Sequence, residues 1–167
     1  AYIVPFRAGS PRSVSIAPEL DAAFDLAING SFGGNLGETY AMTLPVGNKL
    51  TSIILLGLGA DRLSVRDIHI KAAQAFKQAK QFGAKHVAIM LDQVSELSES
   101  FELFGALARL PQLVGYTNSG LKSNPENKSF EQVAFVTAAD GLDAALREAV
   151  ATARGTIIAR RLCNLRS

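Results

Sequence analysis

The chain contains a continuous apolar run at residues 53–59, IILLGLG. Strands that are covered on both faces of a sheet look like this, because neither face can carry polar groups. The glycines near its end, Gly57 and Gly59, indicate a turn out of the strand. Residues 53–59 therefore predict a buried strand of an α/β sheet.

A helix and a second strand are predicted directly after this run. Ser64 is followed three residues later by Asp67, which is close to a capping box at the start of a helix. Apolar residues then recur at helical spacing until Gly83. They are Val65, Ile68, Ala72, Phe76, Ala79 and Phe82. The short apolar run at His86–Leu91 completes a βαβ unit, for which parallel strands are expected.

The rest of the chain continues this alternation of helices and strands. Before residue 53 the patterns predict a strand remnant at Tyr2–Pro5, a helix at Pro18–Asn29 and a strand at Glu38–Pro45. After residue 91 they predict a helix at Ser98–Leu110 with Phe101 facing inward and Pro111 closing it, a polar loop at 119–129, a strand at Gln132–Thr137, and a long helix from Asp140 or Asp143. The predicted fold is a three-layer α/β/α sandwich around a mixed, mostly parallel sheet.

Length and composition fit a single domain over residues 1–167. Hydrophobic residues make up 48% of the chain, which is enough to build a core and excludes general disorder. The formal net charge of +2 gives no general attraction to nucleic acid or to an anionic membrane. The single cysteine, Cys163, excludes an internal disulfide and fits a reducing compartment. No apolar run approaches the roughly 18 residues that a membrane-spanning helix needs.

The glycine-rich residues 30–37, GSFGGNLG, are the first candidate for ligand binding. Backbone N–H groups around Gly33 and Gly34 could approach a phosphate closely, because no Cβ intervenes. The stretch lacks the lysine of a Walker loop, however, and it does not open a helix after a strand. A tight connection into the next strand is the alternative interpretation.

The second candidate comprises Gly57, Gly59 and Asp61, which lie between a buried strand and a helix. Ligands of α/β proteins commonly bind at this end of a parallel strand. The third glycine of the dinucleotide fingerprint is missing, so a strand exit that requires small residues is the alternative.

No other cluster of residues predicts catalysis or metal binding. His69 and His86 have no partner at metal-ligand spacing and are predicted at solvated or edge positions. Cys163 is predicted to be a small buried hydrophobe. Glutamates near the second helix suit its amino terminus, and arginines on the last helix would contact either DNA or another domain or subunit. The residues concerned are Glu96, Glu99, Glu102, Arg147, Arg154, Arg160, Arg161 and Arg166.

Several segments, taken in chain order, match the sequence pattern of one known family. Residues 32–39, FGGNLGET, resemble an F-x-G-K-x-G-E-T stretch, with Asn35 at the position of the usual lysine. The other matches are residues 54–59 with a V-L-L-V-G-L-G strand, residues 64–73 with a helix ending L-R-K-A-A, Tyr116 and Lys122 with a tyrosine and the lysine of Y-K-S, and residues 159–164, ARRLCN, with A-R-D-L-V-N. Over nearly its whole length the chain resembles the amino-terminal domain of the leucyl (cytosol) aminopeptidase family.

The resemblance implies a macro-domain-like fold and a parent protein that is a cytosolic, hexameric exopeptidase. By implication the parent uses two divalent metal ions, zinc or manganese, to release amino-terminal residues from peptides. In that family the metal ligands and catalytic residues belong to the carboxy-terminal domain, so none is carried over to this chain. The leading hypothesis is that residues 1–167 form a non-catalytic domain, without the metal-binding domain. This domain would pack on its own catalytic domain, help form the oligomer or restrict access, and meet peptide substrate only through that domain. The alternative is a stand-alone module that binds ADP-ribose or a nucleotide through the two glycine loops.

Overall fold

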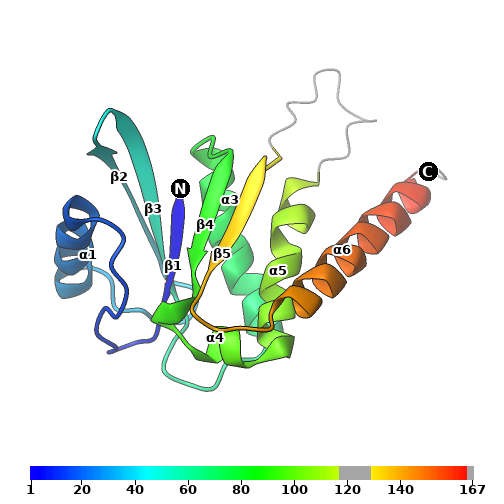
Figure 1. The fold of residues 1–167 in the computed structure, drawn as a ribbon, viewed down its shortest axis with the longest axis horizontal. Helices are drawn as coiled ribbons and strands as arrows, with labels where there is room; N and C mark the ends of the chain where they lie inside the picture. Colours follow the sequence, from blue (N-terminus) through cyan, green and yellow to red (C-terminus); the bar gives the residue numbers. More distant parts are fainter. Residues whose placement is uncertain (117–128, 165–167) are drawn as a thin grey trace.

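The computed structural model describes residues 1–116 and 129–164, which form a five-stranded sheet with helices around it (Figure 1). The strands are β1 (Tyr2–Phe6), β2 (Thr39–Val46), β3 (Lys49–Gly57), β4 (His86–Met90) and β5 (Gln132–Val136). The main helices are α1 (Pro18–Gly30), α2 (Val65–Asp67), α3 (Ala73–Gln81), α4 (Glu96–Glu99), α5 (Phe101–Gly115) and α6 (Asp143–Asn164). Lys122, Arg166 and most of the predicted loop 119–129 lie outside the described residues. No helix in the described ranges is long and apolar enough to cross a membrane.

The sheet is mixed and mostly parallel, as predicted. Its strand order is β2-β3-β1-β4-β5, and only the β2–β3 hairpin is antiparallel. The predicted strand remnant at Tyr2–Pro5 is in fact part of the central strand. Because β1 lies between β3 and β4, the two strands of the predicted βαβ unit flank it and do not pair with each other.

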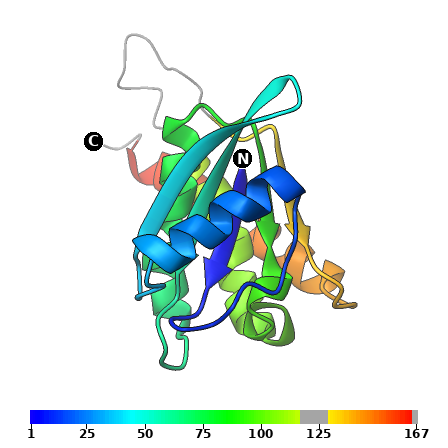
Figure 2. The same cartoon turned by 90° about the vertical axis from the view of Figure 1, so that its left-hand side faces the viewer.

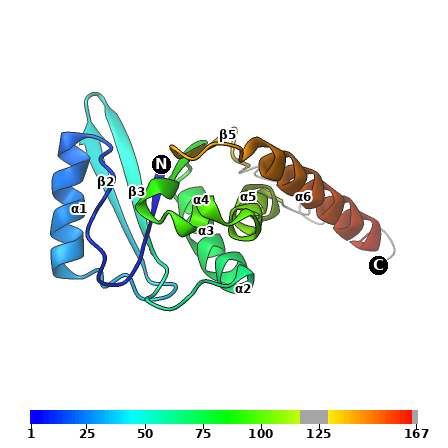
Figure 3. The same ribbon diagram turned by 60° about the horizontal axis from the view of Figure 1, so that its bottom comes forward.

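One apolar core covers each face of the sheet, because successive side chains of a strand point to opposite faces. Along β3, Ile54 and Leu56 face α3 and α5, whereas Ile53 and Leu55 face α1. Figure 2 shows α1 lying across its face of the sheet, and Figure 3 shows the other helices on the opposite side. The predicted three-layer α/β/α arrangement is confirmed.

The helical segment after β3 is less regular than the sequence predicts. The capping box is confirmed, since the Asp67 N–H donates to Ser64 Oγ at 3.1 Å and the Ser64 N–H donates to the Asp67 carboxylate at 3.2 Å. A π-helical turn at Ile68–Ala72 then separates α2 from α3. The predicted stripe is buried at Ile68, Ala72, Phe76 and Ala79. Its two end members, Val65 in the first turn and Phe82 after the last, are exposed.

Three expectations for the later helices are also wrong. Pro111 does not end α5 but lies buried inside it, because packing of this face on the core holds the helix together past the missing N–H. Phe101 starts α5 and is 62% exposed. In α6, Ala149 and Ala153 are buried on the core side, but the later part of the helix extends beyond α5 (Figure 1). Cys163, which was predicted to be a small buried hydrophobe, is exposed there.

Candidate functional site

The structure brings the two predicted glycine loops together at the carboxyl ends of β1 and β3. We call loops 30–37 and 57–61 the glycine edge. The Gly37 N–H donates to the Gly57 carbonyl at 2.8 Å, and the Gly59 N–H donates to the Gly34 carbonyl at 2.9 Å. A further bond joins this edge to the chain after β1, where the Ala8 N–H donates to the Gly59 carbonyl at 3.1 Å. The glycine edge is therefore a contact of backbone with backbone.

Glycine is required at this contact because the two loops approach so closely. A Cβ atom on Gly57 would lie 2.1 Å from the Asn35 carbonyl oxygen, which is far inside van der Waals contact. Gly34 has a φ of +73°, a conformation that side chains with a Cβ rarely adopt, and a Cβ there would meet the Ala8 backbone at 3.1 Å. These contacts account for the missing side chains without a ligand.

The anion position within loop 30–37 is taken by the chain's own Glu38. Its carboxylate accepts hydrogen bonds from the Gly33 N–H at 3.1 Å, the Asn35 N–H at 2.9 Å and the Asn35 side-chain amide at 3.1 Å. The bond from Gly33 is the main reason why the pKa of Glu38 lies below its ordinary value. The loop thus binds an anion, as the glycine pattern suggested, but the anion is internal.

Arg7 binds backbone carbonyls of loop 57–61, as Glu38 binds N–H groups of loop 30–37. It follows β1 directly, and its guanidinium donates to the carbonyl of Leu58 at 3.4 Å and also to that of Asp61. The same side chain forms an ion pair with Glu96 at the start of α4. Sequence reasoning missed Arg7, whose only signal is its position immediately after a strand at the carboxyl edge of the sheet.

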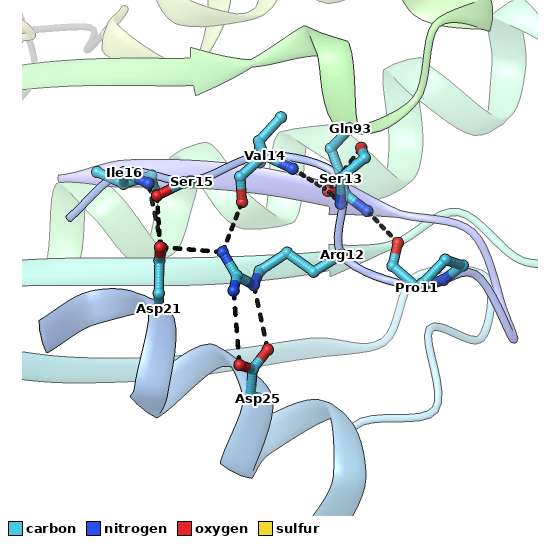
Figure 4. Close-up of polar contacts among 9 residues, drawn as sticks. All are labelled: Pro11, Arg12, Ser13, Val14, Ser15, Ile16, Asp21, Asp25 and Gln93. Atoms are coloured by element: carbon cyan, nitrogen blue, oxygen red, sulfur yellow. Dashed lines mark hydrogen bonds and ion pairs between the residues drawn. The ribbon is translucent and has the colours of Figure 1, made fainter. Parts of the chain in front are cut away.

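Gln93 fastens the chain that runs from β1 to α1 (Figure 4). Its side chain is 7% exposed, and its Oε1 accepts from the N–H groups of Ser13 at 2.7 Å and Val14 at 3.2 Å. Its Nε2 donates to the Pro11 carbonyl at 2.9 Å. Because both ends of the amide bind backbone groups of this segment, Gln93 is a structural residue that a search for charged or nucleophilic groups does not find.

Arg12 ties the same segment to α1, as Figure 4 also shows. Its guanidinium lies 3.0 Å from the Asp21 carboxylate and 3.1 Å from the Asp25 carboxylate. Burial raises the pKa of Asp21, but hydrogen bonds from Ser15 and the Ile16 N–H, together with Arg12, outweigh it and lower the pKa overall. These groups hold the segment beside the sheet and are already neutralised.

Asp92 binds the chain that follows β5, on the other side of β1 from the glycine edge. It follows β4, and its carboxylate accepts from Thr137 Oγ1 at 2.7 Å and from the Ala138 N–H at 2.9 Å, both after β5. The charged side chains of Arg7, Glu38 and Asp92 therefore bind other parts of the same chain, whereas Asp61 is exposed and contributes its backbone carbonyl. Ligand binding at Gly33, Gly34, Gly57, Gly59 and Asp61 stays a prediction, and the contacts favour the alternative interpretation of tight connections.

The comparisons with known proteins identify the family. The model of the cytosol aminopeptidase family, N-terminal domain, matches residues 18–125. The chain belongs to the cytosol aminopeptidase family. No curated protein matches the sequence. The family match supports the predicted role as an amino-terminal domain, and it gives no support to a stand-alone module that binds ADP-ribose or a nucleotide.

Solved structures agree with this family in fold. A mutant of tomato leucine aminopeptidase is 18% identical with a TM-score of 0.72, and the match covers 96% of this chain and 34% of that one. The bottromycin maturation enzyme BotP in complex with Mn is 16% identical with a TM-score of 0.63, covering 95% of this chain and 30% of that one. A second structure of BotP is 17% identical with the same TM-score of 0.63, covering 95% of this chain and 31% of that one. The chain thus spans about a third of the length of the proteins it matches.

The remaining residues considered from the sequence are dispersed in this cytosol aminopeptidase domain. His86 is exposed at the start of β4, 3.4 Å from Glu131. His69 was predicted at a solvated or edge position, but it is only partly exposed and its Nε2 atom is buried. Glu99 and Glu102 lie in the first turns of α4 and α5, as expected. Among residues 1–116 and 129–164, no group of three or more His, Cys, Asp or Glu side chains could hold a metal ion.

Proposed function

We propose that the chain is the non-catalytic amino-terminal domain of a metal-dependent leucyl aminopeptidase. The observation that carries the proposal is the match of residues 18–125 to the N-terminal domain of the cytosol aminopeptidase family. A two-metal peptidase centre needs several carboxylates around ions that lie roughly 3.5–4 Å apart. The described residues do not fit such a centre, because their carboxylates are dispersed or hydrogen-bonded within the chain. In this proposal the metal ions, zinc or manganese, and the peptide bind in another domain of the same protein.

The outer part of α6 supports packing against that second domain. Ile158 and Leu162 are 57% and 59% exposed, on a helix that extends away from the sheet (Figure 3). Exposed apolar side chains grouped at one end of a helix commonly mark a contact surface. The sequence of residues 159–164 also resembles the family's helix that leads into the catalytic domain. We therefore propose that α6 joins the two domains of a cytoplasmic oligomer, with a hexamer as the assembly to test.

The first test is an activity assay on the purified chain. With manganese or zinc added, we expect no release of p-nitroaniline from leucine p-nitroanilide above the buffer background. Tomato leucine aminopeptidase in the same assay would serve as the positive control. Metal-dependent release by the chain, abolished by a chelator, would contradict a non-catalytic role.

The second test concerns the surface of α6 in the full-length protein that contains this domain. Ile158→Glu and Leu162→Glu place charges in the proposed interdomain contact, so we expect weaker oligomer assembly in analytical ultracentrifugation. Leu26→Glu is the matched control, because Leu26 is 77% exposed on α1, on the other side of the sheet. Equal assembly of all three variants, or a source gene that encodes no second domain, would argue against the proposal.

A further inference from the structure

A groove of about 680 Å³ lies on the helical side of the molecule, between the π-helical turn, α3, α5 and α6. We call it the basic groove. The residues that carry the argument are His69, Lys77, Lys80, Leu113, Tyr116 and Arg160. None of its lining residues belongs to the glycine edge, so it is a separate candidate site. Its volume lies within the range of about 300–1,000 Å³ that is usual for small-molecule sites.

Two buried polar atoms of the groove residues have no hydrogen-bond partner in the described part of the chain. They are the hydroxyl of Tyr116 and Nε2 of His69. Buried polar atoms in proteins nearly always have a partner, so each of these two atoms needs one beyond the described residues. A tyrosine hydroxyl donates a hydrogen bond, and so does an imidazole nitrogen in one of its tautomers. Together the two atoms suit a ligand that presents oxygen acceptors.

Cationic side chains surround these atoms. Lys77 and Lys80 reach the groove from α3, and Arg160 reaches it from α6. The ammonium of Lys80 donates to the Val114 carbonyl at 3.1 Å, which fixes its position on the wall. No acidic residue is among the lining residues that the structure describes. A solvated basic surface would explain the lysines alone, but it would leave the buried hydroxyl of Tyr116 unexplained.

The floor of the groove is apolar and the ring of Tyr116 is held in place. Leu110, Leu113 and Val114 of α5 line the groove beside the polar atoms. The guanidinium of Arg161 lies 5.8 Å from the centre of the Tyr116 ring, a distance typical of a cation–π contact. An apolar floor below a cationic rim fits a molecule with one apolar part and one anionic part.

We propose that the basic groove binds a small organic anion, in which one phosphate or carboxylate group is joined to an apolar body. The anionic oxygens accept hydrogen bonds from Tyr116 and His69, and Lys77 and Arg160 neutralise their charge. The apolar body lies on the leucines of α5. The proposal rests on the contacts and charges of the groove itself, and it does not depend on which domain packs against the chain.

Calorimetric titration of the chain tests the proposal with four probes. They are phenyl phosphate, 3-phenylpropionate, inorganic phosphate and the uncharged 3-phenyl-1-propanol. Because both parts of the ligand contribute, we expect phenyl phosphate or 3-phenylpropionate to bind about tenfold or more tightly than the alcohol and than inorganic phosphate. The tighter of the two identifies the preferred anionic group. Binding of the alcohol as tight as that of both anions would overturn the proposal.

Variants locate the binding in the groove. Tyr116→Phe removes only the hydroxyl, and Lys77→Ala removes one exposed cation, so each should weaken binding of the preferred anion by about threefold to tenfold. Lys49→Ala is the matched control, because Lys49 is an exposed cation on β3, outside the groove. Unchanged affinity in both groove variants, or an equal loss in Lys49→Ala, would overturn the proposal. If Tyr116→Phe failed to fold, Lys77→Ala would decide alone, since its side chain is exposed.

Discussion

The glycine edge and the basic groove differ in how their polar groups are used. At the glycine edge, Glu38 accepts the loop N–H groups and Arg7 binds the loop carbonyls. In the basic groove, Tyr116 and His69 keep buried polar atoms without a partner among the described residues. The edge has the sequence pattern of a binding loop, but Glu38 and Arg7 already bind its N–H and carbonyl groups. The groove has no recognisable sequence pattern, and two of its buried polar atoms have no partner among residues 1–116 and 129–164. Hydrogen-bond satisfaction therefore separates candidate sites in this fold better than residue type does.

Gly57→Ala tests whether the glycine edge is as closed as its contacts indicate, and we expect it to have the largest effect. The added Cβ would lie 2.1 Å from the Asn35 carbonyl oxygen and 2.7 Å from the Gly34 carbonyl carbon, so the backbone itself must move. Overpacking of this kind costs about 3 kcal/mol or more of unfolding free energy. Urea denaturation followed by circular dichroism measures the loss.

Gly155→Ala is the control for this substitution. Gly155 lies within α6, and a Cβ there would meet nothing within 4 Å. Alanine favours a helix over glycine, so this variant should gain about 0.5–1 kcal/mol. If Gly57→Ala were as stable as the parent chain, the loops would have room to separate and a ligand between them would become plausible again.

Glu38→Gln tests the internal anion and should have a smaller effect. The pKa of Glu38 is lowered below its ordinary value of 4.5, chiefly by the Gly33 N–H. A carboxyl group with a lowered pKa stabilises the fold at pH values above its ordinary pKa. This contribution disappears as the pH falls through the folded-state pKa. Because the carboxylate is partly exposed, the variant should lose only about 1 kcal/mol at neutral pH.

The comparison with the parent chain should be made across pH. The unfolding free energies of Glu38→Gln and the parent chain should converge in acid, where Glu38 is protonated. Glu148→Gln on the exposed face of α6 is the control and should leave the difference from the parent small at every pH. A constant gap between Glu38→Gln and the parent down to strongly acidic pH would mean that the carboxylate charge is not what stabilises the loop.

The layers of the fold were predictable from local patterns, but the order of the strands was not. Apolar periodicity and the Ser64–Asp67 capping box located the elements around residues 53–91 correctly. The central place of β1 is a matter of long-range pairing between Tyr2–Phe6 and two strands more than 40 residues away, which no local pattern encodes. Pro111 was misjudged for a similar reason, since burial of α5 outweighs the local cost of a proline.

The candidate site was predictable only in part. Position after a strand correctly placed Gly57 and Gly59 at the carboxyl edge, but residue type alone did not reveal what fills the space around them. The partner Glu38 lies within the quoted family motif, yet its role depends on three-dimensional hydrogen bonds. The groove residues come from helices far apart in sequence, and His69 belongs to an irregular turn that helical periodicity does not predict.

Tyr116→Phe tests whether the Tyr116 hydroxyl in the basic groove lacks a partner, and it should have the smallest effect on stability. A hydroxyl without a partner contributes little to the fold, so its removal should change the unfolding free energy of the ligand-free chain by less than about 0.5 kcal/mol. Ser100→Ala provides the contrast, because Ser100 Oγ accepts from the Leu103 N–H at 3.3 Å and caps α5. That variant should lose about 1 kcal/mol.

Adding the preferred anion should then separate Tyr116→Phe from the parent chain. A ligand that binds only the folded state raises the melting temperature according to its affinity. The parent chain and Ser100→Ala should therefore gain similar increments on addition of the anion, and Tyr116→Phe should gain less. A large loss of stability in ligand-free Tyr116→Phe would show that the hydroxyl already has a partner within the fold. The hydroxyl in the basic groove would then have an internal partner, like the polar groups at the glycine edge, and the difference between the two regions would vanish.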